Sequence, residues 1–180
     1  MLEVTAGWKT KVLFLFIGIF FLVSGLAYII GIRINNTASI PLGIYRLTEE
    51  KPVKGDYVMF CPPKRPVFDM ALKRGYIDAG FCSGQYGHIM KRVLGVAGDH
   101  ITVTPKAVTV NGHPIANSAQ MAVDLGNSPM PVYQQPDITL GSDQFLLMGE
   151  NPISFDARYF GLINRSQING VIHPLFTWKN

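Results

Sequence analysis

A run of twenty-one residues without a single charge, VLFLFIGIFFLVSGLAYIIGI at 12–32, constrains this chain more than any other feature. A helix rises about 1.5 Å per residue, so the run spans about 31 Å, roughly the thickness of the hydrocarbon core of a bilayer. We therefore predict a transmembrane helix at 12–32, preceded by a short N-terminal segment at 1–11. The remaining residues, 33–180, suit a single domain with one hydrophobic core.

The charges beside this run predict its orientation. Lys9 and Lys11 precede it and Arg33 follows it. With the α-amino group, the N-terminal flank carries the larger positive charge, and such a flank normally stays in the cytoplasm. We expect the domain in the periplasm of a Gram-negative bacterium, with the helix in the inner membrane.

A cleaved signal peptide is the alternative interpretation of the same segment. The small residues Gly25 and Ala27 are suitable for a cleavage site after Ala27. The apolar run continues to Ile32, beyond the length of a typical signal core, which favours an uncleaved anchor.

The charge distribution argues against a nucleic-acid partner. The formal net charge is only +4, from sixteen basic and twelve acidic residues, and no run of Lys and Arg exceeds two. Nucleic-acid binding normally requires a concentrated basic patch. The mild positive charge is more simply that of a solvated surface near anionic lipid.

The segments after the anchor predict a mainly β domain, because several alternate polar and apolar residues as strands do. Pro and Gly separate them. A short helix is expected at 68–74, ended by Gly75, and residues 113–141, rich in Pro, Asn, Ser and Gln, are expected to form an inserted excursion. Strands are predicted at 43–47, 56–60, 88–96, 101–104, 108–110, 144–148 and 159–163.

Cys61 and Cys82 are the two cysteines, and both fall in the predicted periplasmic domain. An even number of cysteines in an oxidising compartment favours one disulfide, whereas a cytosolic domain would keep two free thiols. Neither cysteine has a CxxC partner or a nearby pair of histidines, so we predict no zinc site and no other metal or cofactor.

The sequence lacks the common catalytic motifs, and a serine and a lysine remain as candidates. Ser39 follows the apolar run by seven residues, in TASIP, where Pro41 stiffens the backbone. Lys91 lies in HIMKRVLGV, where strand alternation places it on one face with Ile89 and Val93. Burial among apolar side chains lowers the pKa of a lysine, and a neutral lysine can take the proton of a serine hydroxyl. The alternatives are a turn serine beside a proline, and a lysine that extends to water at a strand edge.

The order of several blocks resembles the type I signal peptidases, and more closely their conjugative-transfer branch, the TraF peptidases. NTASIPLGIYRL is similar to the nucleophile segment of that branch, and GHIMKRVLGVAGD is similar to the lysine box of signal peptidases. LLMGENPISFDARYFGLI resembles the later family box, and FCPP, RGYIDAGFC and INRSQI resemble blocks of the TraF branch. Together they cover about residues 36–168.

The resemblance implies roles for particular residues. Ser39 corresponds to the nucleophile and Lys91 to the general base. Thr37 matches a hydroxyl donor to the oxyanion, which the backbone N–H of Ser39 would also stabilise. Ser154 would hold the neutral lysine by a hydrogen bond. Asp156 and Arg158 match the rest of that box, and we expect a supporting role for Asp156, because direct pairing with the lysine would raise its pKa.

Two departures from the general family pattern stand out. Ser39-Ile40-Pro41 is one residue shorter than the usual Ser-Met-x-Pro, as in the TraF branch. Glu150 stands where the later box usually has Asp, which leaves the role of that acidic residue open.

The resemblance implies a signal-peptidase-like β domain and a serine peptidase of a conjugative transfer (type IV secretion) system. Its expected partner is a pilin precursor, which it would mature at the periplasmic face, either by hydrolysis or by joining the pilin ends through an acyl-enzyme. A general type I signal peptidase and a non-catalytic, membrane-tethered assembly factor of the conjugation apparatus are the alternative functions.

Overall fold

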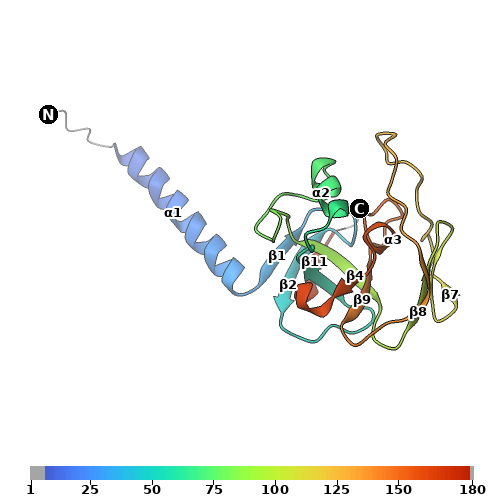
Figure 1. Ribbon diagram of the computed structural model, residues 1–180. Coiled ribbons are helices and arrows are strands. Elements are labelled where there is room, and N and C mark those ends of the chain that lie inside the picture. The colour runs from blue at the N-terminus through green and yellow to red at the C-terminus, as the bar shows by residue number, and fades with distance from the viewer. Residues whose placement is uncertain (1–6, 179–180) are drawn as a thin grey trace.

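The structure is a computed structural model that describes residues 7–178, so the first six residues of the predicted N-terminal segment lie outside it. Its helix α1, Trp8–Ile29, is long and apolar enough to cross a membrane. Figure 1 shows α1 projecting from the β domain. Because none of its residues is buried in the protein, the helix is suited to a single-pass anchor. It ends before the apolar run does, since Gly31 adopts a φ of 88° and the chain continues as a strand.

Two antiparallel sheets make up the domain (Figure 1). The larger has seven strands in the order β1-β2-β11-β3-β4-β9-β10, and the smaller has four in the order β7-β6-β5-β8. The larger sheet consists of β1 Ile32–Asn35, β2 Gly43–Thr48, β3 Tyr57–Phe60, β4 Ile89–Gly95, β9 Gln144–Met148, β10 Ile163–Asn164 and β11 Ile168–Thr177. The smaller consists of β5 His100–Val103, β6 Val108–Val110, β7 His113–Pro114 and β8 Gln135–Thr139, and the remaining elements are α2 Pro66–Lys73, α3 Ala157–Phe160 and the 3-10 helix η1 Arg165–Gln167.

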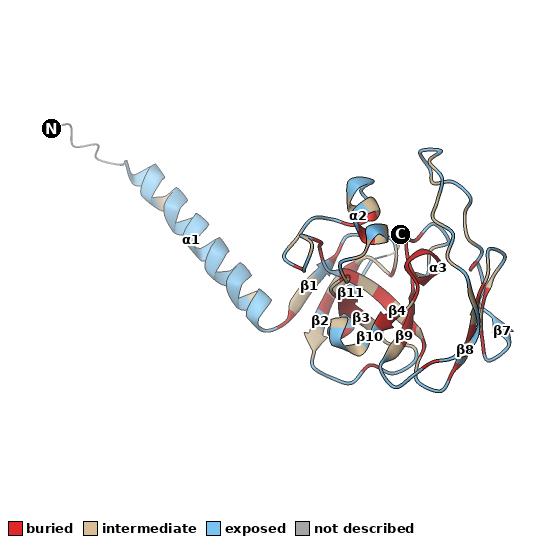
Figure 2. Ribbon diagram, viewed as in Figure 1, coloured by how far each residue is buried: buried red, intermediate tan, exposed pale blue. Residues whose placement is uncertain are grey.

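The hydrophobic core joins both sheets and the short helices. Figure 2 shows buried residues concentrated on β4, β9 and α3, whereas α1 is exposed. The central strands contribute apolar side chains such as Val58, Val93 and Leu147, each fully buried. Removing such side chains from water is the main favourable contribution to the stability of the domain. This rigid centre carries β4 and β9, the two strands that lead to the candidate site.

Most of the predicted elements are confirmed, since strands occupy 43–48, 57–60, 89–95, 100–103, 108–110 and 144–148. The predicted helix is α2, which begins at Pro66, a residue suited to the first helical position because its missing N–H needs no partner there. Gly75 follows it with a φ of 72°, a conformation that favours glycine.

The strand predicted at 159–163 is wrong. Tyr159 and Phe160 belong to α3, and only Ile163 enters a strand, β10. Asp156 caps this helix by accepting from the N–H of Arg158, and Gly161 ends it with a φ of 77°. Aromatic residues favour strands, but here the cap and burial outweigh that preference.

Both ends of the polar segment 113–141 belong to the smaller sheet, since β7 pairs with β6 and β8 pairs with β5. Between β7 and β8 the chain leaves the sheets and forms a small hairpin at 122–130, closed by a bridge between Val123 and Pro129.

Candidate active site

Ser39 lies in the turn that connects β1 to β2, and the side chain of Asn35 organises that turn. The buried Asn35 amide donates to the carbonyls of Thr37, Ile40 and Pro41 at 2.9–3.1 Å. Its oxygen accepts from the backbone N–H of Thr37 at 3.2 Å and from the Thr37 hydroxyl at 2.9 Å. One buried amide therefore determines the path of the backbone on both sides of Ser39.

Tyr45 supports the same turn from β2. Its hydroxyl donates to the Pro41 carbonyl at 2.6 Å, and its ring is fully buried. Neither Asn35 nor Tyr45 was predicted from the sequence as a site residue. The available signal was weak: Asn readily bonds to the backbone of a nearby turn, and Asn35 directly precedes the candidate segment.

Lys91 reaches Ser39 from the middle of the larger sheet. Residues of β4 alternate between buried and partly buried, and Lys91 is on the buried face with Ile89 and Val93, as predicted. Its ammonium group donates to Ser39 Oγ at 2.6 Å, and only 3% of the residue is exposed. The structure thus joins two residues that are fifty-two positions apart in the sequence.

The environment of Lys91 favours its neutral form. Burial lowers the pKa of Lys91 from 10.5 to about 8; the nearby Asp156 carboxylate opposes this shift and the Arg158 guanidinium adds to it. Desolvation outweighs the carboxylate because no ion pair joins Lys91 to Asp156 within residues 7–178. About one tenth of Lys91 is therefore uncharged at pH 7.

A second hydroxyl also contacts Ser39. Ser154, buried in the loop after β9, donates to Ser39 Oγ at 3.1 Å. The family resemblance implied a hydrogen bond from Ser154 to the lysine, whereas the structure directs its hydroxyl to the serine. Gly149 permits this approach, because a Cβ there would lie 3.0 Å from the Ser39 carbonyl oxygen and closer still to Ser154. The Ser39 carbonyl accepts from the N–H of Glu150 at 2.7 Å, which fixes the loop to the turn.

Asp156 and Arg158 form a fully buried ion pair beneath this loop. The guanidinium donates to both carboxylate oxygens at 2.8 Å, and the carboxylate also accepts from the N–H of Gly149 at 2.9 Å. Arg158 further donates to the carbonyls of Asn151, Pro152 and Ser154 at 2.6–3.2 Å. The pair therefore shapes the backbone that carries Ser154.

The two candidate donors to an oxyanion differ in their surroundings. Among residues 7–178, the backbone N–H of Ser39 has no hydrogen-bond partner, so it can receive one. The Thr37 hydroxyl instead donates to Asn35 and would have to rotate toward a substrate.

The carboxylate of Glu150 points to the protein surface. It accepts from the Tyr57 hydroxyl at 2.7 Å and from the Arg92 guanidinium at 3.3 Å. The structure therefore pairs this acidic residue with the edge of β3 and β4, while its backbone N–H contacts the site.

The predicted disulfide between Cys61 and Cys82 is present, with the two Cα atoms 5.5 Å apart. It fastens the loop at 78–87 to the end of β3. His88 lies near the two sulfurs, and the three potential ligand atoms are within 4.8 Å of one another. Because the sulfurs are bonded to each other, neither is available as a thiolate ligand.

Two hollows meet at Ser39. The membrane-side hollow, about 420 Å³, extends past Lys91 to Tyr28 and Arg33 at the end of α1. The hairpin-side hollow, about 430 Å³, extends from Ser39 and Ser154 to the 122–130 hairpin. Their volumes lie in the range of sites for ligands.

Comparisons with known proteins agree with this geometry. The family model described as "Signal peptidase, peptidase S26" matches residues 6–178. A "Plasmid transfer protein TraF" of Escherichia coli is 48% identical over 158 residues, covering 87% of this chain and 89% of that protein. A second Escherichia coli protein of the same description is 49% identical over 152 residues, 84% of this chain and 85% of its own length. A "Conjugal transfer protein TraF" of Agrobacterium fabrum is 34% identical over 151 residues, 82% of this chain and 84% of its own length.

Proposed function

Because this chain belongs to the signal peptidase family, peptidase S26, we propose that it is a membrane-anchored serine endopeptidase with Ser39 as nucleophile and Lys91 as general base. The distance of 2.6 Å between Lys91 Nζ and Ser39 Oγ is the observation that supports this assignment most strongly. A nucleophile and its base must lie within hydrogen-bond reach, and the base must be able to accept a proton. The buried, partly neutral Lys91 meets both requirements.

The first step forms an acyl-enzyme. Ser39 Oγ attacks the carbonyl of the scissile peptide bond and loses its proton to Lys91 Nζ. The negative charge that develops on the carbonyl oxygen is stabilised by the Ser39 N–H and, after rotation, by the Thr37 hydroxyl. One such donor contributes roughly 3 kcal/mol to the barrier reduction. Lys91 then protonates the leaving nitrogen as the peptide bond breaks.

The roles of the remaining residues are positional. Ser154 orients Ser39 Oγ toward the substrate, and the Asp156–Arg158 pair maintains the loop that carries Ser154. Asn35 holds the turn in place before the substrate binds. Such preorganisation matters because small displacements of a nucleophile can slow a reaction by roughly 100-fold.

The relatives support a role in conjugation, and the substrate is part of our proposal. Their descriptions as plasmid or conjugal transfer proteins place them in conjugation, so we assign this chain a peptidase role in conjugation. Its proposed substrate is a pilin precursor of a type IV secretion apparatus. Water resolves the acyl-enzyme in hydrolysis, and the amino terminus of the pilin resolves it in cyclisation.

The anchor and the compartment complete the proposal. With α1 in the inner membrane and its N-terminus in the cytoplasm, Ser39 lies at the periplasmic face, where a membrane-embedded precursor presents its cleavage site. Ser39 is the seventh residue beyond Ile32, so the nucleophile stays within roughly 25 Å of the end of the apolar run. A disulfide between Cys61 and Cys82 suits an oxidising compartment.

The test is the intact mass of the pilin from cells that carry the wild type, Ser39→Ala or Lys91→Met. We expect a trimmed pilin only with the wild type, and a mass lower by one water if the ends are joined. Lys106→Ala, an exposed position in the turn after β5 that lines neither hollow, is the control. Normal trimming in the Ser39→Ala cells, with the variant protein present in the membrane, would contradict the proposal.

A further inference from the structure

The 122–130 hairpin lines the hairpin-side hollow and has no role in the peptidase mechanism proposed above. The 122–130 hairpin is closed by a hydrogen bond from the N–H of Asp124 to the Ser128 carbonyl at 2.9 Å. The Asp124 side chain accepts from the N–H groups of Gly126 and Ser128 at 2.9 and 2.8 Å, which rigidifies the tip.

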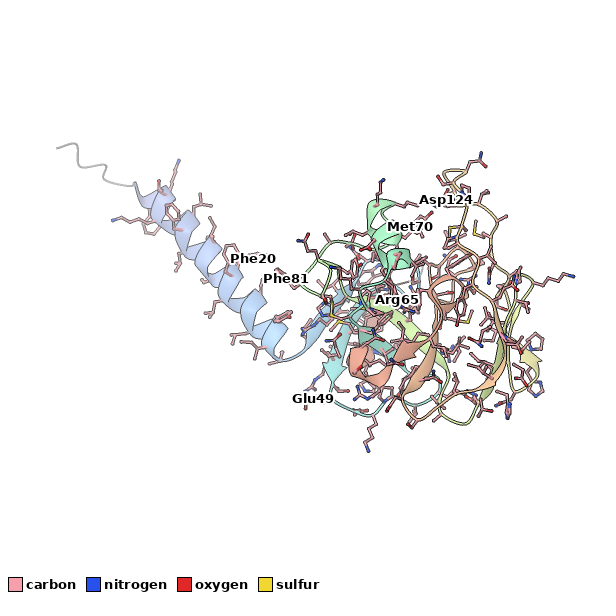
Figure 3. The ribbon with its side chains drawn as sticks, viewed as in Figure 1. Phe20, Glu49, Arg65, Met70, Phe81 and Asp124 are labelled. Atoms are coloured by element: carbon pink, nitrogen blue, oxygen red, sulfur yellow. A yellow bond between two sulfur atoms is a disulfide. The ribbon has the colours of Figure 1, made fainter. Side chains whose placement is uncertain are left out.

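Two side-chain contacts fasten the hairpin to the chain after α2. The Tyr76 hydroxyl donates to the Asp124 carboxylate, and Arg74 donates to the Pro129 carbonyl at 2.7 Å. Five residues before the hairpin, Arg158 donates to the carbonyl of Asn117 at 3.3 Å, so the chain that leads to the hairpin and the Ser154 loop share one guanidinium. Figure 3 shows Asp124 near α2, on which Met70 is labelled. The hairpin is thus fastened on the side of the domain that carries α2.

The hollow between this hairpin and Ser39 is mainly apolar. Leu125 at the tip is 82% exposed, and Ile153 on the Ser154 loop is 50% exposed. Large apolar side chains that are exposed to water beside a nucleophile are suited to binding an apolar group of a ligand. Its apolar lining consists of Ala38, Met121, Leu125, Met130, Ile153 and Phe155.

The positions of the two hollows indicate which part of the precursor each one binds. The membrane-side hollow begins at Tyr28, at the end of α1, so it receives the part of a precursor that comes from the membrane. The hairpin-side hollow begins at the same nucleophile and shares only Ser39, Tyr76 and Phe155 with the first. In a precursor whose acyl side comes from the membrane, the chain that crosses Ser39 continues into the hairpin-side hollow after the scissile bond.

We propose that the hairpin-side hollow binds the residue on the amine side of the scissile bond through an apolar side chain, and that it later binds the amine that resolves the acyl-enzyme. This inference rests on the proposed function. Aminolysis of an acyl-enzyme is the reverse of its formation, so the leaving amine and the attacking amine occupy the same place relative to the acyl carbonyl. One site therefore serves both steps, and its occupation by an amine displaces the water that would hydrolyse the ester.

The atoms balance in this second step. The nitrogen of the incoming amine forms a bond to the acyl carbon, and the bond from that carbon to Ser39 Oγ breaks. The proton lost by the amine passes to Lys91 and from there to Ser39 Oγ, which restores the free enzyme.

The experiment measures which amine the acyl-enzyme accepts. The full-length protein in detergent is given an ester substrate, the precursor segment that ends at the mapped cleavage site, as its methyl ester. Its leaving group, methanol, is too small to fill the hairpin-side hollow. Leucine amide and glycine amide compete as acceptors, and mass spectrometry gives the ratio of the two products. We expect the wild type to use leucine amide roughly ten times as often as glycine amide. This ratio corresponds to the free energy of burying about half of a leucine side chain.

The single variants Leu125→Ala and Ile153→Ala each shorten one apolar wall of the hollow. Each is expected to reduce the preference for leucine amide to roughly threefold or less, the effect of losing contact with about one methylene group. Val123→Ala is the matched control, since Val123 belongs to the same hairpin but does not line the hollow, and it should keep the wild-type ratio. Circular dichroism checks that each variant is folded.

Equal use of both amides by the wild type, or an unchanged preference in both wall variants, would overturn the inference while leaving the peptidase assignment intact. Methyl ester turnover that persists in Ser39→Ala would instead refute the proposed function, and this inference with it.

Discussion

The titration of Lys91 gives the most detailed prediction. Burial lowers the pKa of this residue from 10.5 to about 8, and the proposed mechanism requires its neutral form. About one tenth of Lys91 is then neutral at pH 7 and about one hundredth at pH 6. The rate of acyl-enzyme formation should therefore rise roughly tenfold per pH unit below pH 8 and level off above it.

The same shift predicts how stability changes with pH. The folded pKa lies below the unfolded one, so between pH 8 and 10.5 the unfolded state binds more protons and the free energy of unfolding rises with pH. Below pH 8 the folded state carries the full cost of a buried ammonium, on the order of 3 kcal/mol for a shift of this size. Above the unfolded pKa that cost is absent.

Two measurements test this reasoning together. The first is the pH profile of kcat/KM for the full-length protein with a precursor peptide. The second is urea unfolding of wild type and Lys91→Met at pH 7 and at pH 10.5, in which the stability gained on substitution should be about 3 kcal/mol larger at the lower pH. Lys106→Met, an exposed lysine in the turn after β5, is the control and should show no such difference.

A flat activity profile from pH 6 to 9, or a midpoint at or above pH 10, would refute the role of Lys91 as the base. Equal stability gains on Lys91→Met at the two pH values would show that burial does not lower the pKa of Lys91.

Three further sets of substitutions test the contacts that support Ser39 and Lys91 and the stability of the domain. Asn35→Ala removes the hydrogen bonds that organise the Ser39 turn and should lower kcat roughly 100-fold with little change in the circular dichroism spectrum, whereas unchanged kcat would show that the turn keeps its shape without it. Arg158→Met leaves the Asp156 carboxylate buried without its partner and should cost roughly 3–5 kcal/mol in urea unfolding, so a loss below about 1 kcal/mol would contradict the buried ion pair. Replacing Cys61 and Cys82 together by Ser should cost about 3 kcal/mol, and full alkylation of the unreduced wild type would show that the disulfide is absent.

Local pattern was sufficient to identify the central strands and the position of Lys91. Alternation in HIMKRVLGV places that lysine on the buried face, because side chains of a strand alternate between its two faces. The anchor was equally clear, since α1 covers most of the apolar run. In both cases the information lies within a few adjacent residues.

The remainder depends on contacts between distant segments. The local signals in FDARYFGLI conflict, because Asp and Gly are typical of helix ends whereas the aromatic residues between them favour a strand. The helix forms because the buried ion pair with Arg158 and the surrounding aromatic rings stabilise the cap of Asp156. Gly149 acquires its importance only when the loop after β9 meets the Ser39 turn. The direction of the Ser154 hydroxyl likewise follows from that packing and could not be derived from family resemblance alone.

The most direct test of the Ser39–Lys91 dyad is the covalent intermediate itself. The full-length protein is mixed with the precursor peptide, quenched with acid within seconds, digested and analysed by mass spectrometry. We predict an acyl adduct on the peptide that contains Ser39 in the wild type, and its loss in both Ser39→Ala and Lys91→Met. An adduct on another residue, or cleavage of the precursor by the Ser39→Ala protein, would contradict the account.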